Sequence, residues 1–73
     1  MNSPKPKSTD QILSEFDTMR SIEESARDFY RQIVIDPRVE STEVKSMFAR
    51  IADDEQRHIE IVDRIVHLIR TSL

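Results

Sequence analysis

Three residues of this 73-residue chain have side chains suited to metal binding and interrupt apolar helical faces. They are Glu23 in the first half of the chain, and Glu55 and His58, within the sequence Glu-Gln-Arg-His, in the second half. A carboxylate is costly to bury unless it is paired, protonated or bound to a cation. Two carboxylates and an imidazole that point into one core therefore predict a cation there. Such ligands suit divalent ions such as Fe(II) and Mn(II).

One copy of the chain carries too few of these ligands for a pair of ions. Glu55 and His58 are three residues apart, so they share one face of a helix and can bind one ion or two neighbouring ions. Two copies packed about a two-fold axis would supply four glutamates and two histidines, twice the set of one chain. The ligand count therefore predicts a homodimer or a higher homo-oligomer. The small size of the chain favours the same conclusion, because so short a chain buries little core alone.

Two long helices must position these residues. Residues 8–10 are Ser, Thr and Asp, which are all good N-cap residues, and no Gly or Pro follows them before Asp36-Pro37. This pattern predicts a helix from about residue 9 to residue 35, because proline disfavours helical geometry in the residue before it. Ser or Thr at positions 41 and 42 can cap a second helix that continues without Gly or Pro to Leu73. The short connection, residues 36–40, predicts that the two helices lie antiparallel.

The apolar residues of both segments recur at spacings of three and four, which is the period of a helix with one buried face. In the first segment this face consists of Phe16, Met19, Glu23, Ala26, Tyr30 and Ile33. In the second segment it consists of Val44, Phe48, Ile51, Glu55, His58, Val62, Ile65 and Ile69. No strand pattern is present. The expected fold class is all-α, with residues 9–73 forming one antiparallel two-helix hairpin.

Charged residues that lie off these faces are expected to be solvated. In the first helix Glu24 falls on the same side as Arg20, Arg27 and Arg31, at spacings that allow ion pairs along the helix. In the second helix Asp54 and Arg57 likewise lie off the apolar face.

The composition argues against several classes of function. The chain has no cysteine, which excludes disulfides, thiolate zinc sites and iron–sulfur clusters. Its net charge is −3 and acids and bases are interspersed, so no basic face is available for nucleic acid. No apolar run reaches membrane-spanning length and no signal-peptide pattern is present, so a cytoplasmic protein with no membrane partner is expected. Residues 1–8 include two prolines and lack apolar periodicity, which predicts a disordered tail.

Two segments of the chain resemble the ligand motifs of a rubrerythrin-type ferritin-like domain. In that family one helix reads Glu-x-x-Ala with Phe-Tyr at the sixth and seventh places after the Glu, which matches residues 23–30 here. The other helix reads Ala-x-x-Glu-x-x-His, which matches residues 52–58. The resemblance covers about Phe16 to Val66. Ferritin-like di-iron bundles take one Glu from each of two helices and Glu-x-x-His from each of the other two.

The resemblance implies a di-iron centre shared between two subunits. Standard members hold four helices and two copies of the motif pair in one chain, whereas this chain has one copy. It is similar in this respect to the encapsulated ferritins, although no clear equivalent of their shell-targeting tail is present. Two hairpins would then form a ferritin-like four-helix bundle. In each subunit Glu23 would be a terminal ligand, Glu55 a bridging ligand and His58 the nitrogen ligand.

The implied activity is oxidation of Fe(II) by dioxygen or peroxide, as in a ferroxidase. An alternative is peroxide reduction, for which an external electron donor would be needed because the cysteine-based domain of rubrerythrins is missing. Mn or Zn could load the same ligands. A third interpretation is a non-catalytic helical dimerisation module. Tyr30 is either a hydrogen-bond donor to a ligand carboxylate or a core aromatic, and His67 is expected at the surface.

Overall fold

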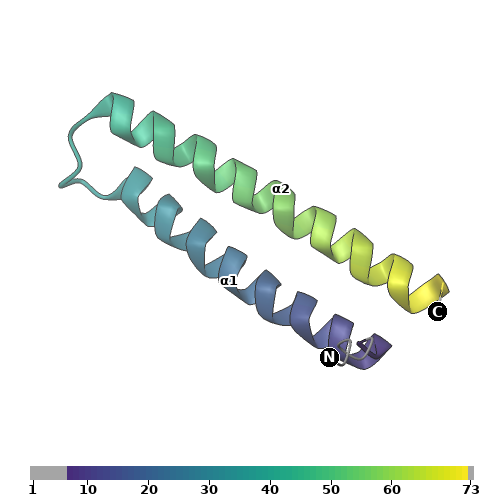
Figure 1. Cartoon of the computed structure of the whole chain (residues 1–73). Helices are drawn as coiled ribbons and strands as arrows, with labels where there is room; N and C mark the ends of the chain where they lie inside the picture. The colour runs from purple at the N-terminus through teal and green to yellow at the C-terminus, as the bar shows by residue number, and fades with distance from the viewer. Residues whose placement is uncertain (1–6, 73) are drawn as a thin grey trace, which may run out of the picture.

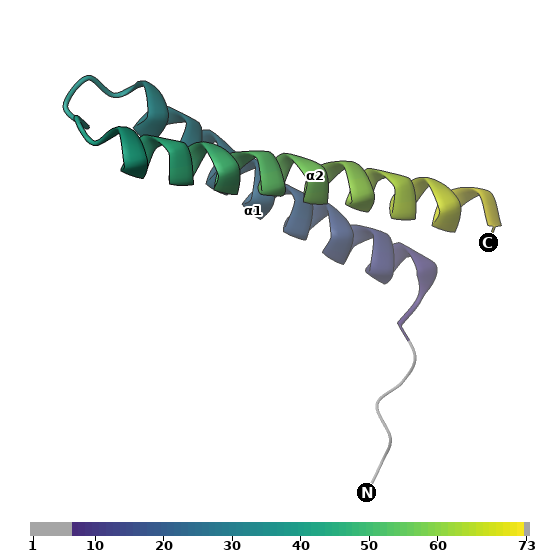
Figure 2. The ribbon, with the colours of Figure 1, turned by 90° about the horizontal axis from the view of Figure 1, so that it is seen from above.

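The computed structural model describes residues 7–72, which form two long helices and the loop that joins them (Figure 1). Helix α1 spans Thr9–Ile35 and helix α2 spans Thr42–Ser72. The helices run antiparallel, with the loop at one end of the hairpin and the start of α1 and the end of α2 at the other (Figures 1 and 2). No strand is present among residues 7–72. The all-α hairpin predicted from the sequence is therefore confirmed.

Serine side chains start both helices. At α1 the Gln11 backbone N–H donates to Ser8 Oγ (3.2 Å), and the Ser8 backbone N–H donates in return to Gln11 Oε1 (2.9 Å). At α2 the Val44 backbone N–H donates to Ser41 Oγ (3.2 Å). These bonds satisfy backbone N–H groups that have no partner within the helix. Both helices thus begin where the capping residues of the sequence place them.

The loop is held by a local pair between Asp36 and Arg38. The Arg38 backbone N–H donates to Asp36 Oδ1 (2.9 Å), and the Arg38 guanidinium donates to Asp36 Oδ2 (2.6 Å). The side-chain hydrogen bond from Arg38 lowers the pKa of the Asp36 carboxyl from its ordinary value. With Pro37 between these two residues, α1 ends at Ile35, as the sequence predicts.

Part of the predicted N-terminal tail and the last residue lie outside the described part of the chain. The tail was predicted for residues 1–8, and residues 1–6 belong to the part that is not described. Over residues 7–72, neither helix offers an apolar stretch long enough to cross a bilayer.

The hairpin covers only part of its apolar surface. Of the described residues, three are buried, and all three lie on α2: Ala52 (2% exposed), Ile59 (2%) and Val62 (6%). No residue of α1, which is described throughout, is buried. Large apolar side chains remain exposed along both helices: Met19, Ile22, Phe29, Ile35, Val44, Met47, Ile51, Ile61 and Leu68. The apolar surface is therefore wider than the contact between the two helices.

Candidate metal centre

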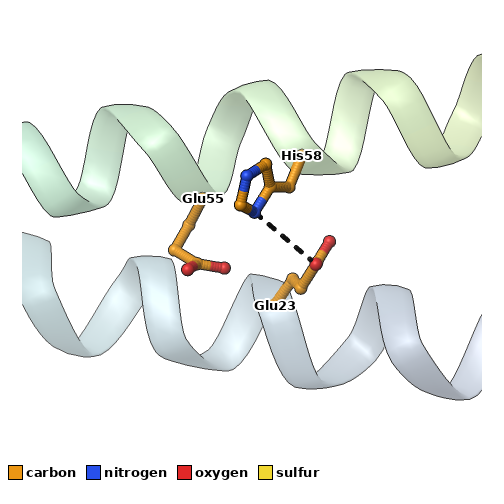
Figure 3. A group of neighbouring side chains, drawn as sticks. All are labelled: Glu23, Glu55 and His58. Carbon is orange, nitrogen blue, oxygen red and sulfur yellow. Dashed lines mark ion pairs between the residues drawn. The ribbon is translucent and has the colours of Figure 1, made fainter.

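The three ligand candidates meet halfway along the hairpin (Figure 3). Glu23 lies close to the midpoint of α1, and Glu55 and His58 lie close to the midpoint of α2. Antiparallel packing brings these midpoints together, and one ligand atom from each side chain lies within 4.8 Å of the others. The structure thus brings together all three residues that the sequence singled out.

Glu23 is largely enclosed and has an unsatisfied oxygen. Its side chain is 18% exposed, whereas that of His58 is 55% exposed. Glu23 Oε1 lies 3.8 Å from His58 Nδ1, which is too long for a hydrogen bond. Glu23 Oε2 is buried and has no hydrogen-bond partner among the described residues. Such an atom is rare in a folded protein and calls for a partner that residues 7–72 do not provide.

The neighbouring cations do not supply that partner. Arg20 and Arg27 lie one turn on either side of Glu23, but their guanidiniums bind other side chains. Arg20 pairs with Glu24 and Asp63, and Arg27 pairs with Asp28. Two carboxylates and an imidazole therefore face one another without a basic side chain between them.

The geometry of this group suits a bound cation. Metal–ligand bonds to nitrogen and oxygen are about 2.0–2.2 Å long, so ligand atoms on one ion are separated by about 3–4 Å. The spread of at most 4.8 Å among the three side chains is close to this range. A cation bound through Glu23 Oε2 would give this atom the partner that it lacks. The residues present fit a metal site.

Comparison with protein families places the whole site within one known domain. The rubrerythrin family model matches residues 19–72. The chain belongs to the rubrerythrin family. The match contains Glu23, Glu55 and His58, and it places the chain in the ferritin-like di-iron superfamily, whose rubrerythrin domains commonly bind iron. No curated protein and no solved structure matched the chain.

Tyr30 of this rubrerythrin-family hairpin belongs to an aromatic cluster. Its ring centroid lies 5.8 Å from that of Phe29, in an edge-on arrangement, and 5.7 Å from that of Phe48 on α2. Tyr30 is half-buried and lies two turns from Glu23, towards the loop. The cluster accounts for its ring, while a role of its hydroxyl towards a ligand carboxylate stays a prediction. His67, as expected, is exposed.

Two polar bridges between the helices were missed by the sequence analysis. Arg20 and Arg27 were expected on a solvated face, which is wrong in part, because both reach across to α2. Arg20 Nε donates to Asp63 Oδ1 (2.6 Å), and Arg27 Nη1 donates to Gln56 Oε1 (2.8 Å). The hydrogen bond from Arg20 lowers the pKa of the Asp63 carboxyl, and the same bond raises the pKa of Arg20. The sequence contained a signal for these bridges, because the two arginines are seven residues apart and so are their two partners.

Proposed function

We propose that this rubrerythrin-family chain forms a two-fold homodimer that binds a pair of iron ions between its subunits and oxidises Fe(II) with dioxygen or peroxide. The observation that carries the proposal is the buried, unpartnered Oε2 of Glu23, which lies beside Glu55 and His58. In a family that commonly binds iron, this arrangement favours a metal over a solvated polar pair.

The second subunit is inferred from what a single hairpin lacks. One chain provides one Glu and one Glu-x-x-His, which is half of the ligand set of a ferritin-like di-iron bundle. His58, at 55% exposure, lies at the open side of the group and would be accessible to ligands and metal from a second copy. The half-site would be completed by the same three residues of a partner.

The position of the site along the helices supports a two-fold arrangement. Glu23, Glu55 and His58 lie near the helix midpoints. With a two-fold axis through the site, the helices of both copies would therefore lie side by side along their full length. An axis elsewhere would leave ends of the helices without a partner. The exposed apolar residues flank the site in both directions, from Met19 and Ile22 on α1 to Met47 and Ile51 on α2. Their burial would stabilise the dimer at roughly 25 cal/mol per Å² of apolar surface.

Within the proposed dimer each side chain has a separate task. Glu23 would bind one ion from the covered side of the site, Glu55 would bridge the two ions, and His58 would provide the neutral nitrogen ligand. The four carboxylates of two subunits would balance the charge of two divalent cations. The apolar residues around the site would exclude water from it. When bound, the iron pair would supply the electrons that reduce dioxygen or peroxide.

Native mass spectrometry after anaerobic loading with Fe(II) tests this proposal, because it reports the oligomer and the metal count together. We expect dimers, or multiples of dimers, with two irons per pair of chains. His58→Ala should lose the iron while it stays folded, whereas Glu60→Gln, which changes an exposed acid of the same helix, should keep it. Stopped-flow absorbance after oxygen addition would then measure oxidation. A folded protein that takes up no iron would leave the non-catalytic dimerisation module as the better interpretation.

A further inference from the structure

The two polar bridges between α1 and α2 have the same antiparallel register. The step from Arg20 to Arg27 is seven residues along α1, and the step from Asp63 to Gln56 is seven residues back along α2. Seven residues are about two helical turns, so both bridges lie on one side of the hairpin. We call this pair of bridges, Arg20–Asp63 and Arg27–Gln56, the polar ladder.

The polar ladder lies on either side of the candidate metal site on α1 and next to it on α2. On α1 Glu23 lies between the two arginines. On α2 Gln56 directly follows Glu55, and His58 lies between Gln56 and Asp63. Any slide of one helix along the other that breaks the ladder also moves Glu23 away from Glu55 and His58.

Both bridges are well formed. Arg20 binds Asp63 through two nitrogens, Nε to Oδ1 at 2.6 Å and Nη2 to Oδ2 at 3.2 Å, and its Nη1 also pairs with Glu24. The forked geometry of a guanidinium on a carboxylate fixes direction as well as distance. Arg27 is only 18% exposed and donates to Gln56 at 2.8 Å.

The apolar contact between the helices would not fix the register by itself. Its buried part consists of Ala52, Ile59 and Val62, and the apolar positions repeat every three or four residues along each helix. A helix pair of this kind can slide by two turns and still bury apolar side chains, as in coiled coils whose register depends on a few polar residues.

The polar residues distinguish between these registers. A slide of seven residues in one direction would pair Arg27 with Asp63, but it would place Arg20 opposite Arg70, where two positive charges repel. A slide in the other direction would place Arg20 opposite Gln56 and Arg27 opposite Ala49, and Asp63 would lose its partner. Only the observed register pairs both arginines.

We propose that the polar ladder holds the register of the hairpin and thereby pre-organises Glu23, Glu55 and His58 for a divalent cation. Its members are positioning residues that act through the helices and do not contact the metal. This inference rests on the proposed metal function. Because exposed ion pairs contribute little to global stability, the ladder is expected to affect metal affinity more than the unfolding free energy.

The test measures binding of Co(II), whose visible absorption reports the number and geometry of its ligands. Arg20→Glu and Asp63→Arg each place like charges at one bridge, and the double variant R20E/D63R restores an opposite pair. We expect each single variant to weaken Co(II) binding by about tenfold or more, the size typical of residues that orient metal ligands. The double variant should recover affinity to within about threefold of the unmodified chain and recover its spectrum.

Two controls separate positioning from general charge effects. The single variants change the net charge in opposite directions, so a loss of affinity in both cannot come from long-range electrostatics. Arg57→Glu makes the same charge change as Arg20→Glu, but it breaks a pair with Asp54 that lies within α2. Arg57→Glu should not weaken Co(II) binding. Circular dichroism checks folding, and Arg20→Gln and Asp63→Asn replace any reversal that unfolds.

A second readout reports the register without metal. Asp17 and Val66 line one cleft with both members of the Arg20–Asp63 bridge, and the chain has no natural cysteine. Cysteines placed at these two positions should be joined by a short bis-maleimide in the unmodified register, joined poorly with a single reversal, and joined again with R20E/D63R. Unchanged Co(II) affinity and crosslinking in the single reversals would overturn the ladder inference. Absent Co(II) binding in the unmodified chain, with the crosslinking pattern intact, would overturn the proposed function instead.

Discussion

The two sides of α2 differ in what covers them, although they share one apolar pattern. On the side that faces α1, Ala52 and Ile59 are each 2% exposed, whereas on the other side Ile51 is 39% and Met47 is 60% exposed. The candidate ligands differ in the same way. The side chain of Glu23 on α1 is largely covered, whereas that of His58 on α2 is exposed. In the homodimer proposed above, a second copy of the chain would cover the exposed apolar residues and complete the metal site.

Ile59→Ala removes apolar contacts from the side of α2 that faces α1. We expect it to have the largest effect on stability. Truncation of a buried Ile leaves a cavity and costs about 3 kcal/mol of unfolding free energy, within the range of about 2–5 for such changes. Urea denaturation followed by circular dichroism measures this loss. Ile61→Ala removes the same atoms from a residue that is 51% exposed, and should cost less than half as much. Equal losses would contradict the difference between the two sides.

Ile51→Lys tests the exposed apolar surface of α2, which the proposed dimer would cover. In the proposed dimer a lysine at this position would bury a charge against apolar residues of the partner, which we expect to weaken dimerisation by about 2 kcal/mol, or roughly thirtyfold in Kd. Analytical ultracentrifugation measures the Kd, and iron uptake should fall with it. Ile35→Lys is the control, because Ile35 is 79% exposed at the end of α1 and lies away from the site. A dimer unaffected by Ile51→Lys would place the interface elsewhere.

Glu23→Gln tests the ligand candidate whose side chain is largely covered within the hairpin. The substitution changes a largely buried carboxylate whose Oε2 has no hydrogen-bond partner among the described residues, so the metal-free protein should be unchanged or stabilised by up to about 1 kcal/mol. The same variant should lose metal-induced stabilisation. Thermal unfolding with and without Mn(II) measures both quantities. A clear loss of stability in the metal-free variant would mean that the carboxylate already has a partner and that the site is structural.

The Arg20–Asp63 bridge predicts a small pH dependence. The pKa of Asp63 is lowered in the folded chain by the hydrogen bond from Arg20, so the folded state prefers the ionised carboxylate. The resulting stabilisation is complete above the unfolded pKa, near 3.8, and is lost as the pH falls through the lowered folded value. The stability difference between the unmodified chain and Asp63→Asn should therefore shrink below that pH. Urea denaturation at a series of acidic pH values measures it, and a constant difference would contradict the bridge.

The sequence predicted well what depends on neighbouring residues. Ser8 and Ser41 cap the helices, and the Asp36-Pro37 pair ends the first one, because these effects act within one or two turns of the chain. The spacing of Glu23, Glu55 and His58 on apolar faces identified the group that the structure brings together. The sequence analysis did not predict the hydrogen bonds of Arg20 and Arg27, because their partners lie far along the chain and on another helix.

The sequence by itself thus determined the two helices, their ends, the family motifs and the identity of the three candidate ligands. Only the tertiary structure decided which part of the wide apolar face is covered and which polar residues join the helices. The physical reason is that helical periodicity fixes the angle of each side chain around its own axis, but not the rotation or register of one helix against another. Packing around Ala52 and Ile59, together with the polar ladder, sets that rotation and register, and so places Glu23 at Glu55 and His58.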